Sequence, residues 1–164
     1  MYTTIFNIDA YLSEYLYGKW GIALQESNDK KMVVKIPKDV YLSNLLHSLT
    51  IRKPKHLPEA WGNVEIVLPF IKEGAKRPDR HNFISAPSAN LFNKRVRQFF
   101  RAELHEYIDN QKHIFGISIK DACMMFVMQF GIESIDPDSL AKNYYRWKGT
   151  IREVNKTSRA FTSR

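Results

Sequence analysis

The sequence predicts an α+β fold that is mainly α, and three observations support this class. Apolar residues recur at helical spacing over most of 88–154, two short β-rich runs precede that stretch, and Gly and Pro separate the segments. We therefore expect a helical C-terminal half with a helix-turn-helix-like bundle, and a small two-stranded element in the N-terminal half. A chain of 164 residues with 44% hydrophobic content is long enough to bury one core.

The predicted N-terminal α+β half covers 1–71. Its first helix is expected over 6–20, with Asn7 or Asp9 as the cap. The two predicted strands are 32–36 and 64–68, since both are rich in β-branched residues. A leucine-rich stretch between them predicts a short helix capped by Asp39, with these residues facing inward: Leu42, Leu45, Leu46 and Leu49.

A Gly- and Pro-containing segment, 72–87, is the predicted loop before the helical half. From Ser88 to His113 the spacing predicts a long helix that ends at Gly116. One of its faces is apolar, from Phe92 to Gln111, and the opposite face carries Lys94, Arg97 and Arg101.

The next segment, "SIKDACMMFVMQFG", predicts a helix with Ser118 as its cap. Because it is apolar on almost every side, we expect it to be buried, with its three methionines filling the core. Cys123 on this helix is expected to be an inert core thiol rather than a nucleophile.

Asp136 followed by Pro137 predicts the start of the last helix, since the aspartate caps an unpaired N–H and proline has none. Its expected apolar face carries Leu140, Tyr144, Trp147, Ile151 and Val154. Gly149 is expected to interrupt this helix or to end it early. We therefore assign 88–154 to a helical DNA-binding half and 155–164 to a polar, basic tail with little order.

The net charge of +8 is concentrated in two blocks. Residues 72–101 and residues 142–164 carry +6 each, which leaves a balance of −4 elsewhere. Clustered cations favour a polyanionic partner, because phosphates release counterions when lysine and arginine replace them. The alternative interpretation is a solvated surface that keeps the protein soluble.

The predicted order of the last three helices is a long helix, a buried helix and a basic amphipathic helix. This order is typical of a helix-turn-helix DNA-binding motif. The predicted nucleic-acid-binding residues on the last helix are Lys142, Asn143, Tyr145, Arg146, Lys148 and Arg152, and Lys94, Arg97 and Arg101 extend the footprint. The connector between the last two helices is longer than the usual turn of this motif. A three-helix bundle with a charged outer face is the alternative. For the cations of 72–101, the alternative to nucleic-acid contact is a set of salt bridges to Glu103 or Asp109 on neighbouring helices.

No pattern of catalytic residues stands out. The glycines form no phosphate-binding loop, the histidines are scattered, and Tyr145 lacks the partners that a DNA-cleaving tyrosine requires. His105, which lies among acidic residues, is expected on a solvated face rather than in a metal site. We expect no enzyme activity, cofactor or metal. The N-terminus resembles neither a signal peptide nor a membrane span, so a cytoplasmic protein without membrane contact is expected.

Three segments, "FNIDAYLSEYLYGKWG", "IPKDVYLSNLLHSLT" and "IKDACMMFVMQFGIESIDPDSLAKNYYRWK", are together similar to small uncharacterised proteins of phages and mobile elements. These proteins carry helix-turn-helix-like DNA-binding labels. The resemblance implies a setting in which DNA is handled, and it assigns no functional residue.

The sequence thus predicts a non-enzymatic DNA-binding protein whose partner is double-stranded DNA, contacted by the basic last helix. RNA is a less favoured ligand, because neither predicted strand shows the aromatic pattern of sheet-borne RNA readers. The alternative function is a protein-interaction or structural module of a phage or mobile-element complex. Either function is compatible with a homodimer or another protein partner.

Overall fold

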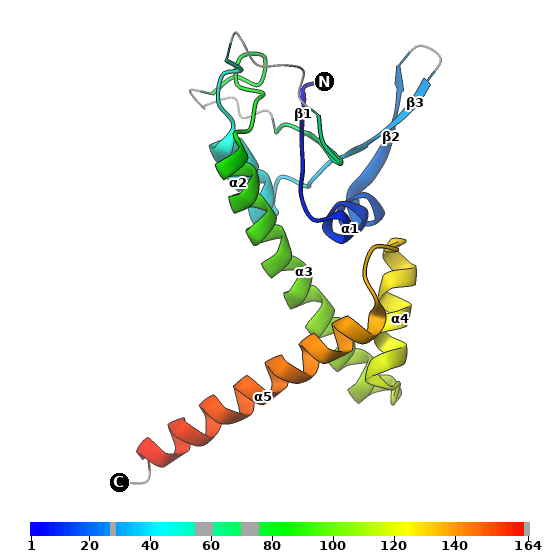
Figure 1. The fold of residues 1–164 in the computed structure, drawn as a ribbon, viewed down its shortest axis with the longest axis vertical. Coiled ribbons are helices and arrows are strands. Elements are labelled where there is room, and N and C mark those ends of the chain that lie inside the picture. Colours follow the sequence, from blue (N-terminus) through cyan, green and yellow to red (C-terminus); the bar gives the residue numbers. More distant parts are fainter. Residues whose placement is uncertain (27–28, 55–60, 70–75, 163–164) are drawn as a thin grey trace.

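The computed structural model describes residues 1–26, 29–54, 61–69 and 76–162, and it confirms the α+β, mainly α class (Figure 1). The elements follow in the order β1 (Thr3–Phe6), α1 (Ala10–Trp20), β2 (Gly21–Glu26), β3 (Asp29–Val34), α2 (Tyr41–Leu49), β4 (Val64–Val67), α3 (Ala86–Phe115), α4 (Ile119–Phe130) and α5 (Pro137–Thr162).

The described strands form a four-stranded sheet in the order β1-β4-β3-β2, instead of the two-stranded element that we expected. β2 and β3 form an antiparallel hairpin from Gly21↔Val34 to Glu26↔Asp29, and β1 pairs antiparallel with β4. The two predicted strands do meet, and they pair in parallel through Val34 and Ile66.

The prediction missed β1 and β2, and for β1 the evidence is not local. Residues 3–6 are short and join the apolar pattern of the following helix, so the first helix seemed to begin at Phe6 rather than at Ala10. A short strand is stable only when a neighbouring strand takes its hydrogen bonds, and β1 finds that neighbour in β4, about sixty residues away in the chain.

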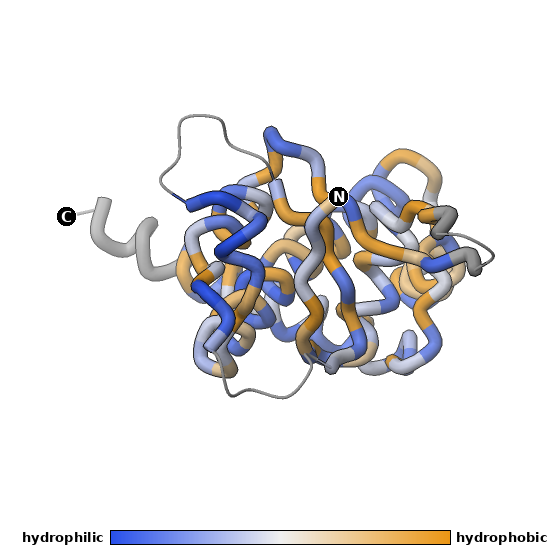
Figure 2. The backbone as a smooth tube through the Cα atoms, turned by 90° about the horizontal axis from the view of Figure 1, so that it is seen from above, coloured by the Kyte–Doolittle hydropathy of each residue, from blue (hydrophilic) through white to orange (hydrophobic). Residues whose placement is uncertain are grey.

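The core lies between the sheet and the helices α1, α3 and α4. At the sheet side, the Phe6 ring meets Phe92 of α3 edge to face, with centroids 5.4 Å apart. Deeper in the helical half, Tyr15 contacts the rings of Phe100, Phe126 and Phe130. These aromatic pairs, which are edge to face except for the stacked Tyr15–Phe126 pair, add to the free energy gained by burying these large side chains. Figure 2 shows hydrophobic and hydrophilic residues interleaved along the backbone, as expected for elements with one buried face.

The ends of the long helices follow the local capping rules. Ser85 caps α3 through the N–H of Ser88, at 3.4 Å, and Ser118 caps α4 through the N–H of Asp121, at 3.1 Å. Asp136 Oδ1 accepts the N–H of Asp138 at 3.1 Å, which confirms the predicted start of α5. The short helix α2 differs, because Val40 and not Asp39 is its N-cap residue.

Helix α4 is not buried on every side, which corrects the prediction. Ala122, Cys123, Phe126, Val127 and Phe130 face the core, where α4 packs against α1, α3 and α5. The three methionines predicted to fill the core instead lie at the surface, with Met124, Met125 and Met128 exposed by 44%, 40% and 72%. Cys123 is buried as predicted, and burial raises the pKa of its thiol to about 11.

Helix α5 also differs from the prediction, because Gly149 does not interrupt it and the helix includes residues 155–162 of the expected tail, of which 163–164 lie outside the described residues. It crosses α3 and then extends away from the rest of the molecule toward the C-terminus (Figure 1). Its apolar face is therefore buried only at the start. Leu140 and Tyr144 are 4% and 2% exposed, whereas Ile151 and Val154, predicted on the same face, are 36% and 57% exposed.

Among the described residues, no helix is both long enough and apolar enough to cross a bilayer.

Gly18 and Gly149 both lie inside helices, and a methyl group should affect the two positions in opposite directions. A Cβ at Gly18 would lie 2.0 Å from the carbonyl oxygen of Phe130, whereas one at Gly149 would meet nothing within 4 Å. Gly149→Ala should therefore raise the free energy of unfolding by about 0.5–1 kcal/mol, because alanine restricts the unfolded chain and favours the helix. Gly18→Ala should lower it by about 1–3 kcal/mol.

Urea denaturation of the two variants and the wild type measures both effects, with Gly149→Ala serving as the matched control. A Gly18→Ala variant as stable as the wild type would contradict the close packing of α1 against the end of α4.

Candidate nucleic-acid interface

The candidate site is centred on the crossing of α3 and α5, where Asp109 of α3 accepts hydrogen bonds from two α5 side chains. The Tyr144 hydroxyl donates to Asp109 Oδ1, and Lys148 Nζ lies 2.9 and 3.0 Å from the two carboxylate oxygens. Burial raises the pKa of Asp109, but the bonds from Tyr144 and Lys148 outweigh it, so the pKa lies below its ordinary value. The ionised carboxylate therefore ties α5 to α3.

His105, one turn before Asp109 on α3, packs against Trp147 of α5. The two rings are stacked, with centroids 4.2 Å apart and planes 26° apart, and His105 is only 6% exposed. Its Nε2 lies 3.4 Å from Asn143 Oδ1, which as an amide oxygen can only accept, so this bond requires a proton on Nε2. The prediction that His105 lies on a solvated face is wrong, because α5 covers it.

Burial is the main reason that the pKa of His105 is lowered, and the positive charge of Arg101 acts in the same direction. The hydrogen bond to Asn143 and the charge of Asp109 act against this. The net effect keeps the imidazole neutral at neutral pH. His105 therefore serves as an uncharged aromatic surface for Trp147.

A pocket of about 590 Å³ opens beside this stack, on the face of α3 that is turned away from the core. Gln98, Arg101, Ala102 and Glu106 form its α3 wall, and Trp147 closes it from α5. A smaller cavity of about 90 Å³ on the other side of Arg101 is lined by Tyr11 and Asn143, among others. Arg101 thus lies between two concave regions at the helix crossing.

The wall of the pocket continues along α3 toward its N-terminus. Residues spaced by three or four share one face of a helix, so Lys94, Arg95, Gln98 and Arg101 form one strip. Lys94, Arg95 and Arg101 are exposed, and the Arg95 guanidinium donates to Gln98 Oε1 at 3.0 Å. This strip of cations leads to the crossing, where Glu106 and Asp109 are the opposing charges among the described residues of the pocket wall.

Two of the predicted nucleic-acid-binding residues are half-buried and form salt bridges within the structure instead. Arg97 donates to Asp9 Oδ2 at the start of α1, and this bond is the main cause of its raised pKa. Lys148 is paired with Asp109 as described. The alternative to nucleic-acid contact, in which the cations form salt bridges within the protein, therefore applies to these two residues. The acid that Arg97 contacts is Asp9, however, and neither Glu103 nor Asp109.

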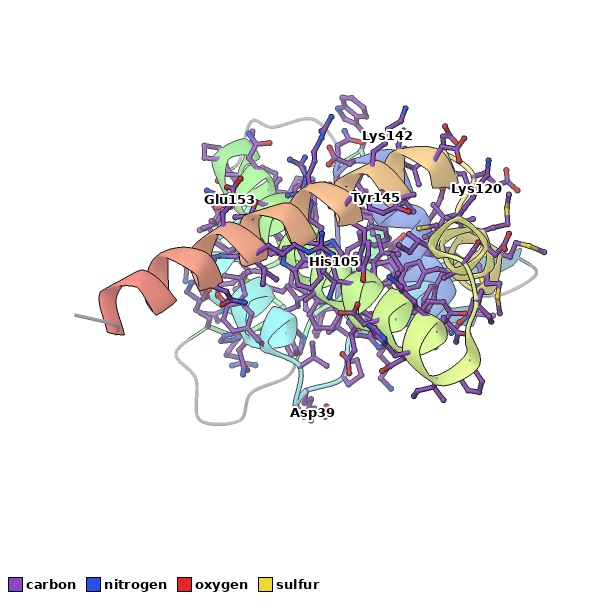
Figure 3. The ribbon with its side chains drawn as sticks, turned by 90° about the horizontal axis from the view of Figure 1, so that it is seen from below. Asp39, His105, Lys120, Lys142, Tyr145 and Glu153 are labelled. Carbon is purple, nitrogen blue, oxygen red and sulfur yellow. The ribbon has the colours of Figure 1, made fainter. Side chains whose placement is uncertain are left out.

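The remaining predicted residues of α5 divide between two faces. Lys142, Tyr145, Arg146 and Arg152 are exposed, whereas the half-buried Asn143 faces His105. In Figure 3, Lys142 and Tyr145 lie on α5 and His105 lies beside it at the crossing, while Asp39 lies apart from α5, at the lower edge of the view. Arg101 and Asn143 are brought together at the small cavity, and Lys94 lies farther along α3.

The sequence analysis missed the roles of His105 and Arg95, and it named Asp109 as a salt-bridge acceptor without identifying Tyr144 and Lys148 as its partners. A signal for these partners was present, because Tyr144 and Lys148 are spaced by four residues and point to one acceptor on a facing helix. The acceptor is Asp109 because of where α3 and α5 cross, and the position of this crossing cannot be predicted from the spacing of residues within either helix.

Comparison with protein-family models, with curated proteins and with solved structures gives no match to this chain. In the part of the chain that the structure describes, no three His, Cys, Asp or Glu side chains are grouped so that they could hold a metal ion.

The pKa of His105 should lie below the ordinary value of about 6.5, and Trp147→Ala should raise it toward that value by exposing the ring to water. As the pH falls below about 6.5, the unfolded chain takes up this proton before the folded protein does, so the free energy of unfolding should fall. NMR titration of the ring resonances measures the pKa, and urea denaturation over the same pH range measures the stability.

Ile151→Ala, one turn beyond Trp147 on the same helix, is the control and should leave the pKa of His105 unchanged. Equal pKa values in the wild type and in Trp147→Ala would show that the stack does not bury the imidazole.

Proposed function

We propose that the protein is a non-enzymatic DNA-binding protein that contacts double-stranded DNA through α5 and the adjoining strip of α3. The observation that carries this proposal is the exposed basic side of α5, a helix that projects from the body of the molecule. We also propose that the protein belongs to a phage or mobile element, because three of its segments resemble proteins of that kind.

Electrostatics supports this proposal. Lys142, Arg146 and Arg152 are exposed, and within the described part of the chain none of the three forms an ion pair. Glu153 is the single acid among seven lysines and arginines in 142–164. Unpaired cations on a projecting helix can approach phosphates without first breaking a salt bridge, and each phosphate that they neutralise releases counterions.

The geometry favours contact with the DNA backbone over direct reading of bases. Asn143, the residue suited to adenine, has its amide oxygen toward His105. The connector between α4 and α5 covers residues 131–136, which is longer than the three- or four-residue turn of a standard helix-turn-helix motif. We therefore propose that Lys142, Arg146 and Arg152 contact phosphates, and that Lys94, Arg95 and Arg101 extend this contact along α3.

Lys142→Gln/Arg146→Gln should weaken binding to a labelled duplex and reduce the slope of log K against log salt by about 1 to 2, because each lost phosphate contact contributes about 0.9. Fluorescence anisotropy between about 50 and 200 mM salt measures this slope. Lys148 is left unchanged, since its loss would disturb the packing of α5 on α3 rather than test DNA contact.

The charge-matched control is Lys35→Gln/Lys38→Gln, which removes two exposed cations next to Asp39, away from α5 (Figure 3). Circular dichroism checks the folding of both variants. Equal binding by the α5 variant and the control would refute the proposal for this helix, and equal binding of duplex RNA would refute the assignment to DNA.

A protein-interaction module is the second candidate function, and the exposed methionines of α4 favour it. Met124, Met125 and Met128 lie on one side of this helix, and such flexible apolar side chains adapt to partner surfaces. The exposed carboxylate Asp121 shares this face of α4 by its spacing, and it complements a basic helix that also exposes Ile151. A second copy of the chain, contacting α4 with its α5, is therefore the partner that we propose for this face.

Under this candidate function, sedimentation velocity should show a dimer that Met124→Ser/Met128→Ser dissociates. Met32→Ser, which changes a methionine that is 50% exposed on β3, is the control and should leave the dimer intact. A monomeric wild type at all accessible concentrations would rule out this candidate.

A further inference from the structure

A second basic concavity lies at the opposite end of α3 from the helix crossing, and its walls come from two segments far apart in the chain. Ile51, just after α2, and Phe83, just before α3, form an antiparallel bridge, with N···O distances of 2.8 and 3.2 Å. In an antiparallel pair the flanking residues also lie opposite each other. The bridge therefore sets Arg52 opposite Asn82.

Further contacts hold this arrangement in place. Lys76 Nζ donates to the carbonyl oxygens of Ser48 and Thr50, the latter at 3.1 Å, and His47 Nε2 lies 3.2 Å from the carbonyl oxygen of Lys76. These bonds tie the end of α2 to the segment that precedes α3. The concavity is thus supported from the side of α2 as well as by the bridge.

The concavity is an open pocket of about 560 Å³, lined by Arg52, Lys53, Asp79, Arg80 and Asn82. Asp79, the one carboxylate among the described lining residues, is engaged by Arg77 Nε at 3.4 Å. Among the described residues, Arg52, Lys53 and Arg80 take part in no ion pair. Three cations that share a pocket without neutralising partners repel one another, so an anion bound between them would relieve that repulsion.

We propose that this pocket binds a phosphate group of a nucleic-acid backbone. Two guanidinium groups and an ammonium group match the oxygens of a phosphate, and the Asn82 amide can donate a further hydrogen bond. The described residues of the lining include no aromatic ring on which a base could stack, so the phosphate and not the base is the ligand.

This inference rests on the proposed function, because the phosphate is assigned to the same duplex that α5 contacts. From the start of α3 to His105 is about 28 Å at 1.5 Å per residue, which corresponds to about eight base pairs. The exposed Lys94 and Arg95 lie on α3 between the two ends. A duplex of about 24 base pairs is long enough to reach both the pocket and the crossing.

The test variant is Arg52→Gln/Arg80→Gln, which removes both guanidinium groups from exposed positions, and Lys35→Gln/Lys38→Gln is the charge-matched control. NMR follows the side-chain amide of Asn82 while excess inorganic phosphate is added. Anisotropy follows binding of a labelled duplex of about 24 base pairs over a salt series. Phosphate should shift the Asn82 amide in the wild type and the control, and not in the pocket variant.

At low salt, the affinity of the pocket variant for the duplex should be at least about tenfold lower than that of the control. The slope of log K against log salt should be reduced by about 1. Duplex affinity equal to that of the control, or an Asn82 amide that phosphate leaves unshifted, would overturn the inference. If phosphate shifts this amide but the wild type binds no duplex, the proposed function fails and the backbone is excluded as the ligand. If Lys142→Gln/Arg146→Gln leaves duplex binding unchanged while the pocket variant weakens it, α5 is excluded as a DNA contact and the pocket remains assigned as the phosphate site.

Discussion

The arrangement of the helical half depends on two carboxylates of α3, each of which accepts hydrogen bonds from a tyrosine and a lysine of another helix. Asp109 accepts from Tyr144 and Lys148 of α5, and Glu103 accepts from Tyr15 and Lys19 of α1. In both cases the tyrosine and the lysine are four residues apart, so they lie on one face of their helix. Burial, followed by the bond to the carboxylate, raises the pKa of both tyrosines, which keeps their hydroxyl groups as donors.

These interactions explain why α3 can be the central helix of the molecule although it carries charged side chains on several sides. A partly buried carboxylate is tolerated when charged and neutral donors satisfy its oxygens. Removing one of these tyrosine or lysine donors would leave a partly buried carboxylate without a partner. The loss in the free energy of unfolding should therefore exceed that for a surface salt bridge. The direction of α5 therefore follows from its packing at the start, near Asp109, and the rest of the helix projects from there.

The same interactions also determine which basic residues remain at the surface. Lys19, Arg97 and Lys148 have acidic partners from other helices, and so they contribute to folding rather than to the exposed charge. Exposed cations lie on α5, on the strip of α3 formed by Lys94, Arg95 and Arg101, and around the pocket at the start of α3, as well as at other places such as Lys35 and Lys38. The net charge of +8 therefore does not describe how the charge is distributed over the surface.

The sequence by itself determined the fold class, the helical C-terminal half and the starts of α4 and α5. Ser118 and Asp136 were recognisable as caps because a cap acts on N–H groups within one turn of itself. The buried residues of α3 were also recognisable, from Phe92 to Ile108, because their spacing reports a single apolar face. Of the nine residues assigned to nucleic-acid contact, however, the sequence could not separate those with acidic partners from those without.

Only the tertiary structure decided that separation, because it depends on which helices cross and where. Arg97 is paired because α1 begins beside it, and His105 is buried because Trp147 covers it, although both resemble surface residues in the sequence. The exposed methionines of α4 show the converse, since an apolar helix is buried only on the sides where a neighbour exists. Local patterns report which residues can share a face, while long-range contacts decide which faces meet a partner and which remain at the surface.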